Sequence, residues 1–250
     1  MSTASRTAPD LTGRTAVVSG ASRGIGLAIA RKLHASGAAV IINYAHDAEA
    51  AEAALRLLPG AAAVRADIAD PAGIDTVTAF ARDRFGGLDV FVHNASYFRP
   101  GPTVGADPAA VRHALDVALN PLLYGAPALA DLMSGRHGRI IAVSSSGARR
   151  AVPQYLAGGI AKAALESMVR YLAADLAGRG VSVNAVSTAK VDKGEGDNPR
   201  LKAIAARTPG GRLTTAEDVA GVVALLCADE AGWLQGQVVT ADGGLGIVAG

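Results

Sequence analysis

The chain of 250 residues is half apolar and only 18% charged, with a formal net charge of +2. This composition predicts one folded domain, and the scattered lysines and arginines offer no basic patch for nucleic acid or a membrane surface. We expect a flexible lead-in over residues 1–11, a domain over residues 12–250, and a buried, unpaired Cys227. The opening lacks a signal peptide, and no run reaches the roughly 18 apolar residues of a membrane span, so we expect a cytoplasmic protein.

The first expected elements are a strand over residues 15–19 and a helix over residues 24–36. Between them, Gly20, Gly24 and Gly26 form a Gly-rich turn. Glycines there allow a tight turn and a close approach to a pyrophosphate, which binds at the helix N-terminus. The order of strand, turn and helix predicts a dinucleotide site, although the glycines alone would also fit an ordinary tight turn.

The second expected strand ends without a carboxylate, because Asn43, Tyr44, Ala45 and His46 follow one another there. An acidic residue at this place accepts a hydrogen bond from the ribose 2′-hydroxyl of NAD. Its absence favours NADP, since the guanidinium of Arg23 in the Gly-rich turn is available for a 2′-phosphate. The alternative for Arg23 is a solvated loop charge.

The later strands and helices alternate along the chain. Strands are expected over residues 39–43, 61–66, 88–93, 140–143, 181–186 and 237–244, and helices over 47–58, 71–85, 109–133, 161–176 and 214–227. Pro121 is expected to break or kink the helix over 109–133, and residues 187–212 are expected to form a lid or binding loop. This alternation predicts a single α/β domain of the Rossmann type, with about seven parallel strands doubly wound by helices on both faces.

Polar residues follow two of these strands at their carboxyl ends, where ligands collect in open parallel sheets. Asp67 fits either a contact with the adenine amino group or a helix cap. Asn94, Ala95 and Ser96 follow the next strand. The loop over residues 96–108 is rich in Gly and Pro, and we expect it to line a substrate pocket.

A larger polar group follows the strand over residues 140–143. It consists of the hydroxyls of Ser144, Ser145, Ser146 and Tyr155 and the ammonium of Lys162. Such hydroxyls hold or protonate an oxygen on which negative charge develops, and we expect a nearby ammonium to lower the Tyr155 pKa. Given a hydride donor, this group is one way to reduce a carbonyl or a double bond conjugated to one.

The chain resembles the short-chain dehydrogenase/reductase family from Thr12 to Gly244. The motifs are VSGASRGIG at the first turn, Asp67, HNAS at 93–96, GRIIAVSSS at 138–146, VNAV at 183–186 and ADGG at 241–244. Most members have Tyr-x3-Lys, but Gly158 stands four residues before Lys162. Tyr155 gives Tyr-x6-Lys instead, which is similar to the NADPH-dependent branch of the enoyl-acyl-carrier-protein reductases. The resemblance implies NADPH-dependent reduction of an enoyl thioester, carried by an acyl carrier protein or coenzyme A, in a homotetramer.

The resemblance implies roles for three residues. Tyr155 would hydrogen-bond the thioester oxygen, Lys162 would hold the nicotinamide ribose, and Ser145 would orient the carbonyl. The structural alternatives are a packed loop aromatic for Tyr155, a solvated helix charge for Lys162 and a strand-end hydroxyl for Ser145. On a helix, Tyr155 shares a face with Lys162 but lies about one turn further away than the usual Tyr. Residues expected to contact the cofactor are Gly20, Ser22, Arg23, Gly24, Ile25, Gly26, Tyr44, Asp67, Ile68, Asn94, Ala95, Lys162 and Thr188.

The chain also departs from the family pattern. The departures are Val117 and Ala118 in place of a helix Asn, with Asn120 one turn on; Ser96 for a Gly; Thr188-Ala189 for Pro-Gly; and Lys193 where a Thr often meets the nicotinamide amide. They leave two rivals open, a ketone or alcohol oxidoreductase of specialised metabolism and a catalytically silent NADP-binding protein. The five histidines lack metal-ligand spacing and are interpreted as structural or solvated, so no metal is expected.

Overall fold

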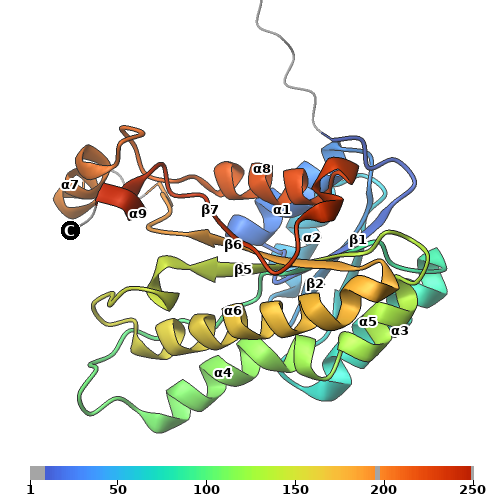
Figure 1. The fold of residues 1–250 in the computed structure, drawn as a ribbon, viewed down its shortest axis with the longest axis horizontal. Coiled ribbons are helices and arrows are strands. Elements are labelled where there is room, and N and C mark those ends of the chain that lie inside the picture. The colour runs from blue at the N-terminus through green and yellow to red at the C-terminus, as the bar shows by residue number, and fades with distance from the viewer. Residues whose placement is uncertain (1–8, 195–197, 249–250) are drawn as a thin grey trace, which may run out of the picture.

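Seven parallel strands form one sheet in the computed structural model, which describes residues 9–194 and 198–248 (Figure 1). They are β1 Thr15–Ser19, β2 Ala39–Tyr44, β3 Ala62–Arg65, β4 Val90–His93, β5 Arg139–Ser145, β6 Ser182–Thr188 and β7 Val238–Thr240. Their order is β3-β2-β1-β4-β5-β6-β7, so the direction of winding reverses between β1 and β4. This reversal is the switch point of a doubly wound sheet, and the predicted fold class is confirmed.

Helices cover both faces of the sheet (Figure 1). One face has α1 Gly24–Ala35, α2 Ala48–Arg56 and α8 Ala216–Cys227, and the other has α3 Pro71–Phe85, α4 Pro108–Leu123, α5 Ala126–Leu132 and α6 Leu156–Leu176. The short helices α7 Pro199–Arg207 and α9 Leu245–Val248 lie together at one end of the sheet, and the 3-10 turns are η1 Ser146–Ala148, η2 Ala177–Arg179 and η3 Asp229–Trp233. Within the described ranges, no helix combines the length and apolar character needed to cross a membrane.

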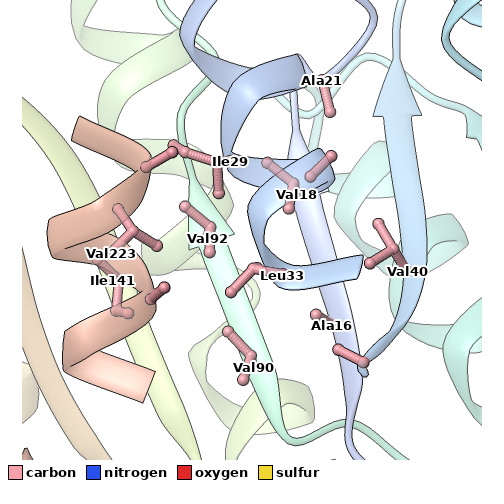
Figure 2. Close-up of a cluster of buried hydrophobic side chains, with 14 of the residues drawn as sticks. Ala16, Val18, Ala21, Ile29, Leu33, Val40, Val90, Val92, Ile141 and Val223 are labelled. Carbon is pink, nitrogen blue, oxygen red and sulfur yellow. The ribbon is translucent and has the colours of Figure 1, made fainter. Parts of the chain in front are cut away.

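The middle parts of the strands are largely apolar because helices bury both faces of the sheet. Alternate residues of one strand therefore enter two separate cores. Val17 packs with the helices from α3 to α6, whereas its neighbour Val18 packs under α1 and α8. Figure 2 shows the second core, where Ile29 and Leu33 of α1 and Val223 of α8 face the strand side chains. These two cores fix the strand ends that the polar residues follow.

Of the break or kink that is expected at Pro121, the break does not occur there. The helix continues through Pro121 to Leu123, and the chain leaves it at Tyr124 and Gly125 before α5 begins. A Cβ on Gly125 would lie 2.3 Å from the Pro121 carbonyl oxygen, so the break falls where glycine permits this close contact. A side chain from β4 faces the carbonyl that Pro121 frees, as described below.

The segment over residues 187–212 is not the structureless loop that the sequence analysis predicts. It contains α7, whose N-cap Asn198 accepts a hydrogen bond from the Arg200 N–H at 3.0 Å and whose first residue is Pro199. Asn followed by Pro is a local helix-start signal, so this helix was predictable from the sequence. Residues 195–197 of the segment lie outside the described residues.

The folded domain begins before residue 12. Leu11 is completely buried, and its N–H donates to the Ser36 carbonyl at 2.7 Å. The predicted boundary is therefore too late, because an apolar residue at the end of a polar stretch was assigned to the lead-in. Residues 1–8 of that lead-in lie outside the described residues.

Candidate active site

The carboxyl ends of β1, β4, β5 and β6 lie next to one another at one edge of the sheet. The pairing register sets Ser145 at the end of β5 opposite Thr188 at the end of β6. On the other side of the switch point, β1 pairs with β4, and Ser19 and His93 stand at their ends. In an open parallel sheet this edge is where a ligand binds.

The Gly-rich turn between β1 and α1 has the backbone shape that its glycines predict. Gly20 and Gly24 have φ angles of +60° and +57°, a region that other residues rarely enter. A Cβ on Gly26 would lie 2.3 Å from the Gly20 carbonyl oxygen and 2.5 Å from Asn94 Nδ2, so no side chain fits there. Arg23 is the N-cap residue and makes no capping hydrogen bond with its side chain. The turn thus fits a pyrophosphate at the N-terminus of α1.

Asn94 ties the end of β4 to this turn. Its Nδ2 donates to the carbonyls of Ser19 and Gly20 at 3.0 and 3.1 Å. The Ser19 hydroxyl oxygen accepts from the backbone N–H groups of Asn94 and Ala95 at 2.9 and 3.0 Å. These contacts join segments more than 70 residues apart in the chain into one wall of the predicted cofactor site.

His93 is completely buried and joins this wall to α4. Its Nε2 lies 2.9 Å from the Ala118 carbonyl oxygen, and its Nδ1 lies 3.3 Å from Ser19 Oγ. Because Nε2 faces a carbonyl, it holds the ring proton, and Nδ1 accepts the proton of the Ser19 hydroxyl. Burial, and after it the charge of Lys162, lowers the His93 pKa to about 3. The ring is therefore neutral at pH 7.

The same histidine explains how α4 accommodates Pro121. Proline lacks an N–H group, so the Val117 carbonyl four residues earlier has no partner within the helix. His93 Nε2 donates to the neighbouring Ala118 carbonyl at 2.9 Å, and the ring faces the Val117 carbonyl as well. The interpretation of His93 as structural or solvated does not include this function, because the contacts depend on the packing of β4 against α4.

Tyr155 is the N-cap residue of α6, and its side chain hydrogen-bonds with Ser145. The ring of Phe98, in the loop over residues 96–108, packs against it with 5.7 Å between ring centroids. Burial raises the Tyr155 pKa, and the hydrogen bond with Ser145 opposes part of that rise. The expectation that a nearby ammonium lowers this pKa is therefore wrong, and the phenol is protonated at neutral pH.

The Tyr155 ring folds back over the first turn of α6. A Cβ on Gly158 would lie 3.0 Å from the Tyr155 hydroxyl oxygen. Position 158 is one turn before Lys162 on the same helix face. The hydroxyl therefore lies over the first turn of α6, on the helix face that carries Lys162 one turn later, although Tyr155 itself stands outside the regular helix.

Lys162 is buried, with 6% of its surface exposed, and its Nζ donates to the Val143 carbonyl at 2.7 Å. This burial contradicts the alternative of a solvated helix charge. Burial also lowers the Lys162 pKa to about 8, so the ammonium is mostly charged at pH 7. The side chain brings a positive charge to the end of β5, beside Ser145.

One turn after Lys162, Glu166 is a buried carboxylate that the sequence analysis does not identify. Its two oxygens accept from Ser144 Oγ at 2.7 Å and from Arg149 Nε at 3.1 Å. These bonds hold both ends of the segment that contains Ser145 against α6. The sequence contains a signal for this role. Glu166 stands four residues after Lys162 on the same face of an apolar helix, and carboxylates are rarely buried without partners.

The end of β2 has no carboxylate among the four residues that the sequence analysis considers, but Asp47 follows directly. Asp47 Oδ1 caps α2 by accepting from the Ala50 N–H at 2.9 Å, and Oδ2 lies 3.3 Å from Arg23 Nη1. The Arg23 side chain is exposed and held near the end of β2, where Tyr44 is half-buried. This arrangement places a cation that is paired with a carboxylate beside the predicted ribose position.

The remaining predicted cofactor residues also follow strand ends. They are Ser22 and Ile25 in the Gly-rich turn, Asp67 and Ile68 after β3, and Thr188 at the end of β6. Asp67 is exposed and accepts from the Ala69 N–H at 3.0 Å, whereas Asp70 is the cap of α3. The helix-cap alternative for Asp67 is therefore wrong. Thr188 is buried, and its hydroxyl donates to the Ala241 carbonyl at 2.9 Å.

Asn120 makes a hydrogen bond outside its own helix. Its Nδ2 donates to the Ala69 carbonyl at 2.6 Å, which ties α4 to the loop after β3. Lys193 is exposed in the coil after β6. The departures from the family pattern therefore change the surroundings of the site, in which Tyr155 hydrogen-bonds with Ser145 and Lys162 follows on the same helix.

A cavity of about 180 Å³ lies beside Tyr155, between the loop over residues 96–108, the start of α4 and the residues flanking Tyr155. Its lining combines apolar side chains, among them Val111 and Leu156, with the polar side chains of Arg99, Asp107 and Gln154. The expectation that this loop lines a pocket agrees with this arrangement. Across the described part of the chain, no group of three or more His, Cys, Asp or Glu is arranged to hold a metal ion.

The sequence and the fold match a known family. The family model described as "Enoyl-(Acyl carrier protein) reductase" matches residues 20–246. The chain belongs to the short-chain dehydrogenase/reductase family. The 1-cyclohexenylcarbonyl-CoA reductase of Streptomyces collinus is 35% identical over 94% of this chain and 88% of its own length. The galactitol 2-dehydrogenase of Agrobacterium fabrum is 32% identical over 94% of this chain and 98% of its own length.

A solved structure extends the match to a bound nucleotide. A short-chain dehydrogenase from Burkholderia cenocepacia J2315, in complex with NADP, has a TM-score of 0.87 and 34% identity, covering 94% of this chain and 98% of that chain. The protein is therefore an oxidoreductase of this family with a nucleotide-cofactor fold. Its named relatives act on different substrates, so membership alone does not define what it reduces or oxidises.

Proposed function

We propose that the protein reduces an α,β-unsaturated acyl thioester, carried by an acyl carrier protein or coenzyme A, with NADPH. The observation that supports this most is the position of Tyr155. Its protonated hydroxyl comes from outside α6, bonds with Ser145 and reaches the helix face of Lys162 above a glycine. A donor placed this way suits an oxygen that is separated from the carbon receiving the hydride.

The cofactor proposal rests on the fit of the Gly-rich turn and on charge at the end of β2. Gly20, Gly24 and Gly26 leave room for a pyrophosphate, and Asn94 holds the turn in that shape. Arg23 supplies the cation for a 2′-phosphate, which favours NADPH over NADH. NADPH, when bound, supplies the hydride for the β-carbon.

In the proposed reaction, the Tyr155 hydroxyl donates a hydrogen bond to the thioester oxygen. Negative charge develops on that oxygen as the β-carbon accepts the hydride, and the donor stabilises the resulting enolate. The raised pKa of Tyr155 suits this role, because the phenol keeps its proton. The charged Lys162 adds positive potential and holds the ribose hydroxyls, and a solvent proton reaching the α-carbon completes the reduction.

The cavity beside Tyr155 offers apolar side chains such as Val111 and Leu156 to the acyl part of such a substrate, next to polar ones. It opens next to Phe98, whose exposed ring packs on Tyr155. Among the relatives, the Streptomyces collinus reductase is named for a coenzyme A thioester with a ring double bond next to the carbonyl. That name supports a conjugated thioester as the substrate class here.

A ketone or alcohol oxidoreductase is the second candidate. It is favoured by the hydrogen bond between Ser145 and Tyr155, which also suits a carbonyl oxygen held by both hydroxyls, and by the named activity of the galactitol dehydrogenase. A catalytically silent NADP-binding protein is the third, because Lys193 and the residues around Val117 depart from the family pattern.

The test follows NADPH consumption with a 2-enoyl thioester and, in parallel, with a 3-ketoacyl thioester. We expect turnover of the enoyl substrate, and a loss of at least about 10²-fold in Tyr155→Phe, the scale for removing one oxyanion donor. Tyr171→Phe makes the same change at an exposed position of α6 and should retain activity. Turnover of the keto substrate alone would favour the second candidate, and NADPH binding without turnover the third. Full activity in Tyr155→Phe would refute the proposed role of its hydroxyl.

A further inference from the structure

Two glycines flank the Tyr155 ring. A Cβ on Gly147, in η1, would lie 2.5 Å from Tyr155 Cδ1 and Cε1. A Cβ on Gly158, in α6, would lie 2.5 Å from Cε2 and Cζ of the same ring. Non-bonded carbons normally stay about 3.5–4.0 Å apart, so neither position has room for even a methyl group. The ring occupies a slot whose two sides are bare backbone.

Neither glycine is needed for the shape of the backbone. Gly147 and Gly158 are absent from the described glycines with positive φ, and Gly158 lies within the regular part of α6. Alanine is a stronger helix former than glycine, so a helix by itself would favour a side chain at position 158. The space for the Tyr155 ring is the feature that requires glycine at both positions.

The slot also decides where the hydroxyl lies. The phenol fills the space that a side chain at position 158 would occupy. Its oxygen lies 3.0 Å from the point where a Cβ on Gly158 would stand. Position 158 is buried and lies one turn before Lys162 on the same face. Because position 158 has no side chain, the Tyr155 ring fits there, and its hydroxyl reaches Ser145 and the face of α6 that carries Lys162.

We propose that Gly158, with Gly147 opposite, is a positioning residue that holds the Tyr155 hydroxyl in its donor geometry. This inference rests on the proposed role of Tyr155 in binding the thioester oxygen. A methyl group at position 158 displaces the ring and separates the hydroxyl from Ser145. We expect the remaining fold to be kept, since the three atoms nearest to a Cβ at position 158 all belong to the Tyr155 side chain.

The experiment compares Gly158→Ala with Gly221→Ala. Gly221 is a glycine within α8, and a Cβ there would meet no described atom within 4 Å, so this control makes the same change without a clash. We expect Gly158→Ala to fold, to bind NADPH within about twofold of the wild type, and to lose kcat by about 10²-fold, as Tyr155→Phe does. The double variant Tyr155→Phe/Gly158→Ala should lose no more than Tyr155→Phe, because both changes remove one interaction.

A second measurement is independent of turnover. Replacing the five tyrosines with 3-fluorotyrosine gives fluorine NMR signals, and Tyr155→Phe identifies the one from Tyr155. Gly158→Ala and Gly147→Ala should move that signal, whereas Gly221→Ala should not. An unmoved signal, or wild-type kcat in a folded Gly158→Ala protein, overturns the inference. Failure of the proposed function would show differently, as a wild type that turns over neither thioester. A moved fluorine signal would then still support the positioning of Tyr155 by the two glycines.

Discussion

Acidification should destabilise the protein through His93. The ring is completely buried and neutral, with its pKa lowered to about 3 mainly by burial. In the unfolded chain an imidazole has its ordinary pKa of about 6.5. Between these two values the unfolded state binds more protons than the folded state. The contribution of His93 to stability is therefore complete above pH 6.5 and is lost as the pH falls below it.

The size of the effect follows from the two pKa values. Between pH 7 and pH 5 the linkage relation gives a loss of about 2 kcal/mol in the free energy of unfolding, since the folded ring remains neutral at pH 5. That is a large part of the 5–15 kcal/mol that stabilises a typical domain. Other groups titrate over the same range, so the informative quantity is the difference from a variant that lacks the imidazole.

His93→Gln is the suitable variant, because an amide N–H remains near the Ala118 carbonyl but accepts no proton. Urea unfolding at pH 7 and pH 5, at one protein concentration, is followed by far-UV circular dichroism, since the single Trp233 is 96% exposed and reports little on the core. His46→Gln makes the same change at an exposed loop position. The wild type and this control should lose about 2 kcal/mol more than His93→Gln. Equal losses in all three proteins would refute a buried, neutral His93.

Two further predictions concern cofactor binding. The pKa of Lys162 is lowered to about 8, and we expect its side chain to bind NADPH in the charged form. The affinity for NADPH, measured by fluorescence titration, should therefore fall about tenfold per pH unit above pH 8, and Lys162→Met should abolish this dependence. A wild-type affinity that stays constant up to about pH 10 would contradict the role of Lys162. Arg23→Ala should weaken NADPH at least about tenfold, the value of a hydrogen bond between charged groups, and leave NADH within about twofold. Equal losses for the two nucleotides would rule out a 2′-phosphate contact of Arg23.

The sequence was sufficient to predict the sheet, its helices and the Gly-rich turn. Buried strands such as Thr15–Ser19 are short apolar runs ended by turn residues, and the helix Pro71–Phe85 has its cap and its closing glycine in the sequence. These features depend on neighbours in the chain, so local patterns encode them. The helix Pro199–Arg207 had a similar local signal, which the search for a period overlooked.

The arrangement of the site depended on contacts between distant segments. His93 meets Ser19 across 74 residues, and Glu166 meets Ser144 across 22, so no local pattern encodes either bond. The raised pKa of Tyr155 likewise depends on burial that only packing creates.

The amino-acid sequence by itself thus determined which chemical groups the protein has and the order of elements that brings them to one edge of the sheet. In the sequence, Tyr155 stands seven residues before Lys162, and Gly158 lies between them. Only the tertiary structure decided where the Tyr155 hydroxyl lies, because its ring folds back over Gly158 and against Gly147. A side chain outside a regular helix is directed by the space its neighbours leave, and that space exists only after the segments have packed.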